Sequence, residues 1–201
     1  MQQRLYSKEH VYERYERMLP AVRRAHGILT DAAQFMRQGG RKCFIAVFDV
    51  DDTVLLADGR PCVSGMELYE ACRRHGIPVY FVTAREEDPE TRTWTERQLR
   101  AIGATGYAEL IMQKTGSSSG GGARSARGAP VFSETSSFKT RTRAELVART
   151  GCAIILNVGD QWTDVVEFGS EKEIDLMLLR DDGARLLFQP RETNVVWALK
   201  L

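Results

Sequence analysis

The stretch Phe44-Ile-Ala-Val-Phe-Asp-Val-Asp-Asp-Thr-Val-Leu55 decides which fold this sequence predicts. It overlaps a short apolar run, residues 43–48, that is rich in β-branched and aromatic side chains and lies shortly after two glycines. Such a run predicts a β-strand that is covered on both faces. Asp49 and Asp51 stand at its carboxyl end, two residues apart, so an extended backbone would direct both carboxylates to the same side.

Paired carboxylates at a strand end favour a metal site. Two ionised carboxylates that lie close together repel each other unless a cation or a proton separates them. Mg²⁺ takes oxygen ligands and would relieve this repulsion. The alternative is a solvated strand end that carries two incidental Asp residues.

The run Phe48-Asp-Val-Asp-Asp-Thr-Val-Leu55 resembles the first motif of the haloacid dehalogenase (HAD) superfamily, most of whose members are Mg²⁺-dependent phosphatases. The resemblance implies that Asp49 is the nucleophile and forms an aspartyl-phosphate. It also implies that Asp51 is the general acid and base, and that Thr53 helps to hold the loop at the substrate.

The rest of the chain alternates between apolar strands and helical segments. We expect strands at 43–48, 77–82, 107–113, 153–158, 174–180 and 185–189, and helices at 8–37, 65–75, 89–102, 137–150 and 161–168. Pro20 is expected to divide the first helix or to start a second one. The alternation predicts an α/β fold with a parallel sheet between two layers of helices and the site beyond the carboxyl ends of its strands. The resemblance implies that this fold is the Rossmann-like fold of the HAD superfamily.

Only a minimal cap is expected over this site. The turn signal Asp58-Gly59 predicts a small hairpin or flap, and too few residues separate Thr53 from the next helix for a larger lid domain. We expect residues 1–40 to form a helical segment packed on the core, and residues 41–201 to form the phosphatase domain. A Gly/Ser-rich stretch predicts a flexible insertion at about 115–130 within that domain.

Thr83 and Arg85 directly follow the second predicted strand. Thr83 matches the second motif of the superfamily, which implies a catalytic hydroxyl that donates to a phosphoryl oxygen. Arg85 is a candidate for substrate binding because guanidinium geometry suits phosphate. The alternative for Arg85 is a salt bridge to one of the next acidic residues, Glu86, Glu87 or Asp88.

Three cations, Lys139, Arg141 and Arg143, stand near the start of the predicted helix 137–150. Cations in a first helical turn oppose the helix dipole, and an anion bound near that end would explain them. Lys139 matches the third motif of the superfamily, a lysine that steadies the nucleophile and the transferred phosphoryl group. Arg143, one turn later on the same face, either supports Lys139 at the substrate or is solvated. Lys114, at the end of the third predicted strand, is the competing candidate for the motif lysine.

The run Asn157-Val-Gly-Asp-Gln-Trp-Thr-Asp164 begins within the last two residues of the fourth predicted strand, 153–158, and continues past its end. It carries two more acidic residues, Asp160 and Asp164. Asp160 would be a further carboxylate at the metal ion, and Asp164 would support it or a coordinated water. The alternative is a helix N-cap at Asp160 and a solvated Asp164. The whole run resembles the branch of the superfamily that includes bacterial class B acid phosphatases and plant vegetative storage proteins.

Composition limits the other classes of function. The chain has 201 residues and a formal net charge of +1, so no global field favours a polyanion or a membrane surface. No apolar run approaches a membrane span and no secretory signal is recognisable, so we expect a cytoplasmic protein. Cys43 and Cys152 are interpreted as small core residues, which fits a reducing compartment, although a disulfide between two of the four cysteines stays open.

The sequence therefore predicts a phosphomonoester hydrolase that uses Mg²⁺ and takes a small phosphorylated substrate. The expected site comprises the catalytic residues Asp49, Asp51, Thr83 and Lys139, the substrate-binding residues Thr53, Arg85 and Arg143, and the metal ligands Asp49, Asp51, Asp160 and Asp164. Acidic neighbours are expected to keep Asp51 protonated, so that it can protonate the leaving oxygen and then activate water.

Two alternatives to this reading stay open. A nucleotide or polynucleotide-end phosphatase would use the arginines of the insertion, Arg124 and Arg127, together with the basic residues 139–143. A catalytically idle storage or scaffold protein is the other alternative, and the intact set of acidic and basic site residues argues against it.

Overall fold

The computed structural model describes residues 8–39, 43–114, 134–160, 185–188 and 197–200. These contain the strands β1 (Phe44–Phe48), β2 (Val79–Glu86), β3 (Glu109–Gln113), β4 (Ala153–Gly159), β5 (Arg185–Phe188) and β6 (Trp197–Lys200). They form one six-stranded sheet in the order β3-β2-β1-β4-β6-β5. The contacts from β3 through to β6 are parallel, and only β5 runs antiparallel to its neighbour β6. The predicted parallel α/β fold is thus confirmed.

Several predicted elements differ in detail or lie outside the described residues. The sequence did not predict β6, whose four residues carry only a short apolar pattern. The strand β2 extends to Glu86 because it pairs with β3 as far as Gln113, so Thr83 and Arg85 lie within the strand and not after it. The expected strand 174–180, the helix 161–168 and the insertion 115–130 lie outside the described residues.

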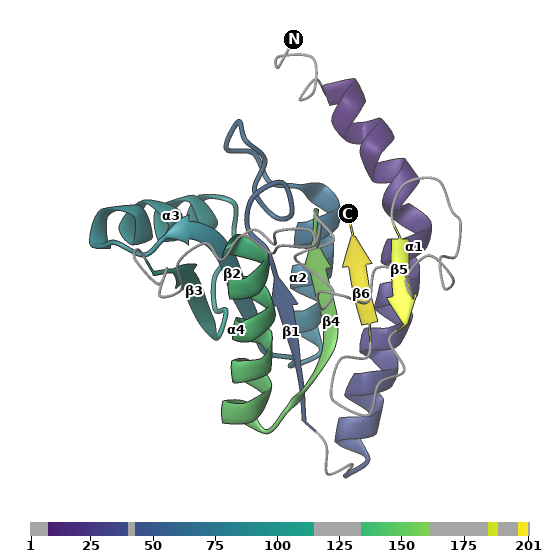
Figure 1. The fold of residues 1–201 in the computed structure, drawn as a ribbon. Helices are drawn as coiled ribbons and strands as arrows, with labels where there is room; N and C mark the ends of the chain where they lie inside the picture. Colours follow the sequence, from purple (N-terminus) through teal and green to yellow (C-terminus); the bar gives the residue numbers. More distant parts are fainter. Residues whose placement is uncertain (1–7, 40–42, 115–133, 161–184, 189–196, 201) are drawn as a thin grey trace, which may run out of the picture.

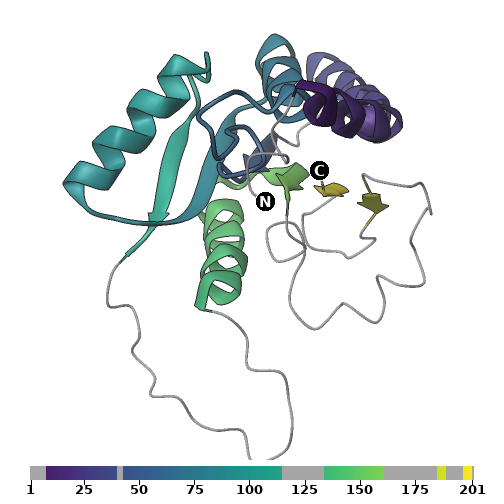
Figure 2. The same cartoon turned by 90° about the horizontal axis from the view of Figure 1, so that it is seen from above.

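Helices cover both faces of the sheet, as Figure 2 shows from above. The helix α4 (Glu134–Thr150) lies on one face, where Phe138 and Leu146 pack on Ile45, Val47 and Ile154. The helices α1 (Lys8–Arg37), α2 (Val63–Arg74) and α3 (Pro89–Ala101) lie on the other face, over the larger part of the core. Alternate residues of β1 therefore face opposite helical layers, and Asp49 continues the series that faces α4.

The helix α1 is a single element, although Pro20 lies inside it. The expected division at this proline is wrong. Pro20 is exposed, while the buried stripe Met18, Val22, Ala25 and Leu29 continues across it at helical spacing. Burying such a stripe is worth about 1.5–3 kcal/mol for each large side chain, which offsets the roughly 3 kcal/mol that an internal proline costs.

The inner stripe of α1 packs on α2. Ser64 donates a hydrogen bond to the Met18 sulfur over 3.0 Å, and His26 Nε2 lies 3.0 Å from Glu67 Oε1. Within the described residues, no helix combines the length and the apolar character that a membrane span requires.

A disulfide joins Cys43 to Cys152 at the amino ends of β1 and β4. The interpretation of these two as core residues is wrong, because Cys43 is exposed and Cys152 is half-buried. The buried thiols are Cys62 and Cys72, and burial raises the pKa of Cys72 to about 12. The expectation of a reducing compartment rested on unpaired cysteines, and it stays a prediction.

Candidate active site

The loop after β1 leaves the sheet beside the end of β4. Phe48 pairs with Val158, and the Asp49 amide donates to the Val158 carbonyl over 2.9 Å. Asp160 follows β4 directly, so the two acidic residues leave neighbouring strands at the same edge of the sheet. Figure 1 shows the loop after β1 rising from this edge.

The loop itself is tightly built. The amides of Val54 and Leu55 both donate to the Val50 carbonyl, and Asp52 has a positive φ of 51°. A bridge between Leu55 and Pro61 then forms a small flap, and α2 begins two residues later. This flap is the element that the turn signal Asp58-Gly59 predicted.

Lys139 contacts Asp49. Its ammonium group donates to Asp49 Oδ1 over 2.7 Å, and the side chains of both residues are only 6% exposed. Because two charges removed from water are tolerated only as a closely paired set, this contact is a strong constraint on the site. The helix α4 begins at Glu134, so Lys139 lies in its second turn. The sequence predicted a position in the first turn. The anion that explains this buried lysine is the carboxylate of Asp49.

Asp51 is held by Arg85. The guanidinium donates to both carboxylate oxygens, from Nε to Oδ2 over 3.0 Å and from Nη2 to Oδ1 over 2.6 Å. Such a two-point contact is the strongest form of an arginine–carboxylate pair. The sequence alternatives for Arg85 were a substrate contact or a bridge to its acidic neighbours. In the structure Glu87 pairs instead with Arg92, which holds the pKa of Glu87 below its usual value.

The remaining donors of Arg85 bind the helix α3. Nη1 donates to Thr95 Oγ1 over 2.9 Å and to Gln98 Oε1 over 2.7 Å. The guanidinium carbon also lies 4.7 Å from the ring centre of Trp94, within cation–π range. Arg85 therefore links α3 to the loop that carries Asp51.

Two of the predicted hydroxyl residues are fully buried. The Thr83 hydroxyl accepts a hydrogen bond from the Arg85 amide over 3.2 Å. The Thr53 hydroxyl is buried and has no hydrogen-bond partner among the described residues, and the Thr53 carbonyl abuts α2 at Gly65. A Cβ atom added at Gly65 would overlap that carbonyl oxygen and lie 2.8 Å from the carbonyl carbon. Gly65 thus permits the close approach of α2 to the loop, a role that the sequence did not reveal.

Arg143 and Asn157 add further polar groups to the face of the sheet that α4 covers. Arg143 is only 4% exposed, so the alternative of a solvated side chain is wrong, and its Nη2 donates to Thr140 over 3.2 Å. Asn157 is fully buried, and within the described part of the chain neither polar atom of its side chain has a hydrogen-bond partner. It pairs with Val47 on β1, two residues before Asp49. Sequence reasoning did not select Asn157, although an amide inside an apolar strand was a usable signal.

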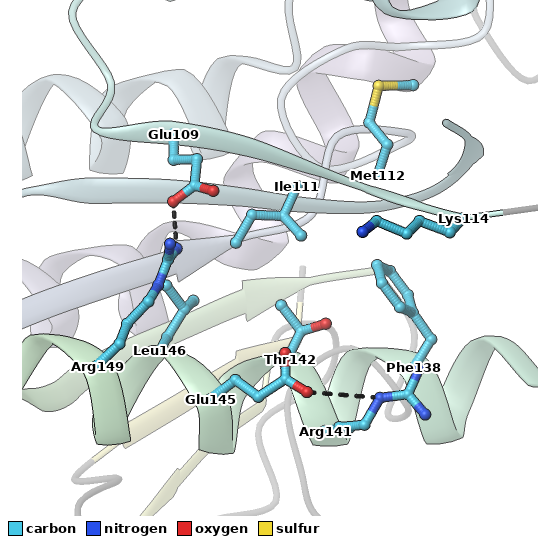
Figure 3. A pocket seen from close by; sticks show the side chains of 10 residues that line it. All are labelled: Glu109, Ile111, Met112, Lys114, Phe138, Arg141, Thr142, Glu145, Leu146 and Arg149. Atoms are coloured by element: carbon cyan, nitrogen blue, oxygen red, sulfur yellow. Dashed lines mark hydrogen bonds and ion pairs between the residues drawn. The ribbon is translucent and has the colours of Figure 1, made fainter. Parts of the chain in front are cut away.

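A pocket of about 390 Å³ lies between β3 and α4 (Figure 3). Its apolar lining comes mainly from Ile111, Phe138 and Leu146, and an ion pair between Arg149 and Glu109 lies at one end. Lys114 is exposed and lines this pocket, whereas Lys139 contacts Asp49. Of the two candidate lysines, only Lys139 therefore lies at the predicted nucleophile.

The described acidic residues fit a hard divalent ion by the chemistry of their oxygen donors. Asp49 and Asp160 supply carboxylates from neighbouring strand ends, which are the oxygen donors that Mg²⁺ takes. Within the part of the chain that the structure describes, three potential metal-binding side chains are not gathered in one cluster. Asp164, the fourth expected ligand, lies outside the described residues.

Residues 57–181 match the model of the HAD superfamily, subfamily IIIB (acid phosphatase). The match covers more than half of the chain. The chain belongs to this family. It is accordingly a phosphatase, and the resemblance noted in the sequence is confirmed. The matched range begins after Asp49 and Asp51, so the assignment to subfamily IIIB does not depend on the first motif.

A solved structure supports the α/β fold independently. A class C acid phosphatase from Bacillus anthracis with tungstate bound aligns with a TM-score of 0.55, over 86% of this chain and 73% of that chain. Its sequence is 16% identical, so the likeness shows the fold alone. No curated protein matches the sequence.

Proposed function

We propose that this protein is a Mg²⁺-dependent phosphomonoester hydrolase that acts through an aspartyl-phosphate on Asp49. The observation that carries the proposal is the buried pair of Lys139 and Asp49 at the carboxyl edge of the sheet. A lysine brought from a separate helix to a buried carboxylate suits a site where negative charge accumulates during phosphoryl transfer.

Asp49 is the proposed nucleophile. An Asp side chain is ionised at neutral pH and can attack phosphorus without a base. Lys139, fixed at 2.7 Å from Asp49 Oδ1, would offset charge both on the nucleophile and on the transferred group. The Thr83 hydroxyl, which accepts from the Arg85 amide and as a hydroxyl can also donate, is the proposed second donor to a phosphoryl oxygen.

Asp51 is the proposed acid and base, but its surroundings differ from those expected. Its partner is the guanidinium of Arg85 and not a second carboxylate, and both of its oxygens accept hydrogen bonds. This is the arrangement of an ionised carboxylate, which serves directly as the base toward water in the second step. As the acid of the first step, Asp51 would carry the proton on the second lone pair of one oxygen, which leaves both contacts with Arg85 in place.

Mg²⁺ is the proposed cofactor. Asp49 and Asp160 would hold it, together with Asp164 and with an oxygen of Asp51. The main-chain oxygen of Asp51 is the atom that could bind without breaking the contact with Arg85. A bound Mg²⁺ would neutralise part of the negative charge that four acidic residues and a phosphate dianion bring together.

The test is hydrolysis of nitrophenyl phosphate by the full chain, before and after exhaustive chelation. Chelation should abolish turnover, and Mg²⁺ should restore it better than Ca²⁺, whose larger and looser coordination shell misplaces the nucleophile. A nitrophenyl phosphodiester serves as the negative control substrate. Full activity after chelation would contradict the proposed cofactor, and no activity under any condition would contradict the proposed hydrolase.

A further inference from the structure

We propose that Arg85 is a positioning residue that fixes the carboxylate of Asp51, and that it does not bind the substrate phosphate. This inference rests on the proposed function, in which Asp51 moves the proton to and from the leaving group. The cue is the contrast in exposure: the side chain of Asp51 is 55% exposed, while that of Arg85 is 12% exposed.

Four of the five N–H donors of Arg85 are already engaged. A guanidinium has five N–H groups, and here Nε and Nη2 each donate to Asp51 while Nη1 donates to Thr95 and Gln98. A phosphate could gain a two-point contact only by displacing the carboxylate or the side chains of α3. Arg85 is therefore committed to protein partners on both of its sides.

The helix α3 fixes Arg85 in turn. The Thr95 hydroxyl donates to the Thr91 carbonyl over 2.8 Å, so its oxygen is left to accept from Arg85. Trp94 lies against the guanidinium and remains 53% exposed. Three residues of α3 thus hold Arg85: Thr95 and Gln98 by hydrogen bonds and Trp94 by a ring contact.

The consequence for Asp51 is a fixed direction. It stands on a loop and would otherwise exchange between rotamers, which spoils the alignment that proton transfer needs. A flat two-point contact removes this freedom, which a lysine, as a point charge, could not do. Arg85 therefore acts on the reaction through Asp51.

The experiment compares two substrates whose need for an acid differs. Nitrophenolate leaves without much protonation, whereas the alkoxide of an alkyl phosphate has to be protonated as it leaves. For Arg85→Ala, we expect kcat/KM for the alkyl phosphate to fall by about 10²-fold, the lower range of general acid catalysis, with a much smaller loss for nitrophenyl phosphate. The inhibition constant of inorganic phosphate should change little.

Two further variants complete the test. Gln98→Leu leaves the contact with Asp51 but removes one anchor, so a smaller loss of the same selective kind is expected even if Arg85→Ala folds poorly. Arg92→Ala is the matched control, because Arg92 pairs with Glu87 and Glu96 and not with Asp51. It should affect both substrates equally and weakly.

The inference would be overturned if kcat/KM of an active, folded Arg85→Ala protein fell equally for the two substrates, or did not fall at all. A weaker inhibition by phosphate that matches the loss in kcat/KM would overturn it as well, since Arg85 would then be a phosphate ligand. A wild-type protein that hydrolyses neither ester would contradict the proposed function, and this inference with it.

Discussion

The ammonium of Lys139 donates to the carboxylate of Asp49 over 2.7 Å, although 90 positions separate the two residues in the chain. Only the tertiary fold can bring them together, because one follows β1 and the other lies on α4. Both are buried, so each depends on the other for its charge to be tolerated. The contact that links α4 to the loop after β1 therefore also lies at the proposed nucleophile.

Lys139→Met should lower turnover of nitrophenyl phosphate by about 10²- to 10³-fold, the usual effect of removing one preorganised donor. Lys114→Met is the matched control and should cost little, because Lys114 is exposed and lines the pocket beside β3. Lys139→Met also removes the cation that lies beside the buried carboxylate of Asp49, so Lys139→Arg, which keeps the charge, should retain more stability in urea titrations. A larger loss from Lys114→Met than from Lys139→Met would reverse the assignment.

Gly65→Ala should lower kcat more than it raises KM. The added methyl group overlaps the main chain of Thr53, so the loop that carries Asp51 has to move relative to α2. Steady-state kinetics and circular dichroism on the same preparation check this. Gly27→Ala is the control, because a Cβ added at Gly27 meets nothing within 4 Å. Unchanged kcat in a folded Gly65→Ala protein would show that the close approach does not position the loop.

Reduction of the disulfide between Cys43 and Cys152 should destabilise the protein without removing the site. The bridge closes a loop of 109 residues, for which the chain-entropy model gives about 4–5 kcal/mol. We therefore expect dithiothreitol to lower the Tm of the wild-type protein and to leave that of Cys43→Ser/Cys152→Ser unchanged. An identical Tm with and without reductant in the wild type would contradict the pairing.

Asp88 should make the stability of α3 dependent on acid pH. Its carboxylate caps the helix by accepting from the amides of Glu90 and Thr91, and hydrogen bonding from Thr91 holds its pKa below the usual 3.8. Because the folded pKa is lowered, this stabilisation is present above about pH 4 and is lost as pH falls through the folded pKa. Asp88→Asn keeps an acceptor at the cap without the titration. The difference in urea stability between the two proteins should therefore change between pH 5 and pH 3, and a constant difference would refute this.

The sequence predicted those features that depend on local patterns. Apolar runs and turn residues located β1 and β4, and with them the strand ends where Asp49 and Asp160 stand. The break at Pro20 was predicted wrongly, because the cost of a proline is local while the buried stripe that outweighs it depends on packing against α2. The contacts between side chains were the hardest feature to predict from the sequence.

Arg85 illustrates this last limit. Three acidic residues follow it directly, yet its partner Asp51 lies 34 positions away. A sequence pattern does not show whether a charged side chain pairs with a residue close to it in the chain or with one that only the fold brings near. The amide of Asn157 was missed although its place inside an apolar strand was a usable signal, and the structure adds that its side chain has no hydrogen-bond partner among the described residues.

The most direct test of the central claim is to quench the wild-type enzyme with acid during turnover and to weigh the peptide that contains Asp49. We expect this peptide to gain the mass of one phosphoryl group, and the peptide from Asp49→Asn, treated in the same way, to gain none. A phosphoryl group on any other residue, or an Asp49→Asn protein that turns over like the wild type, would contradict the account.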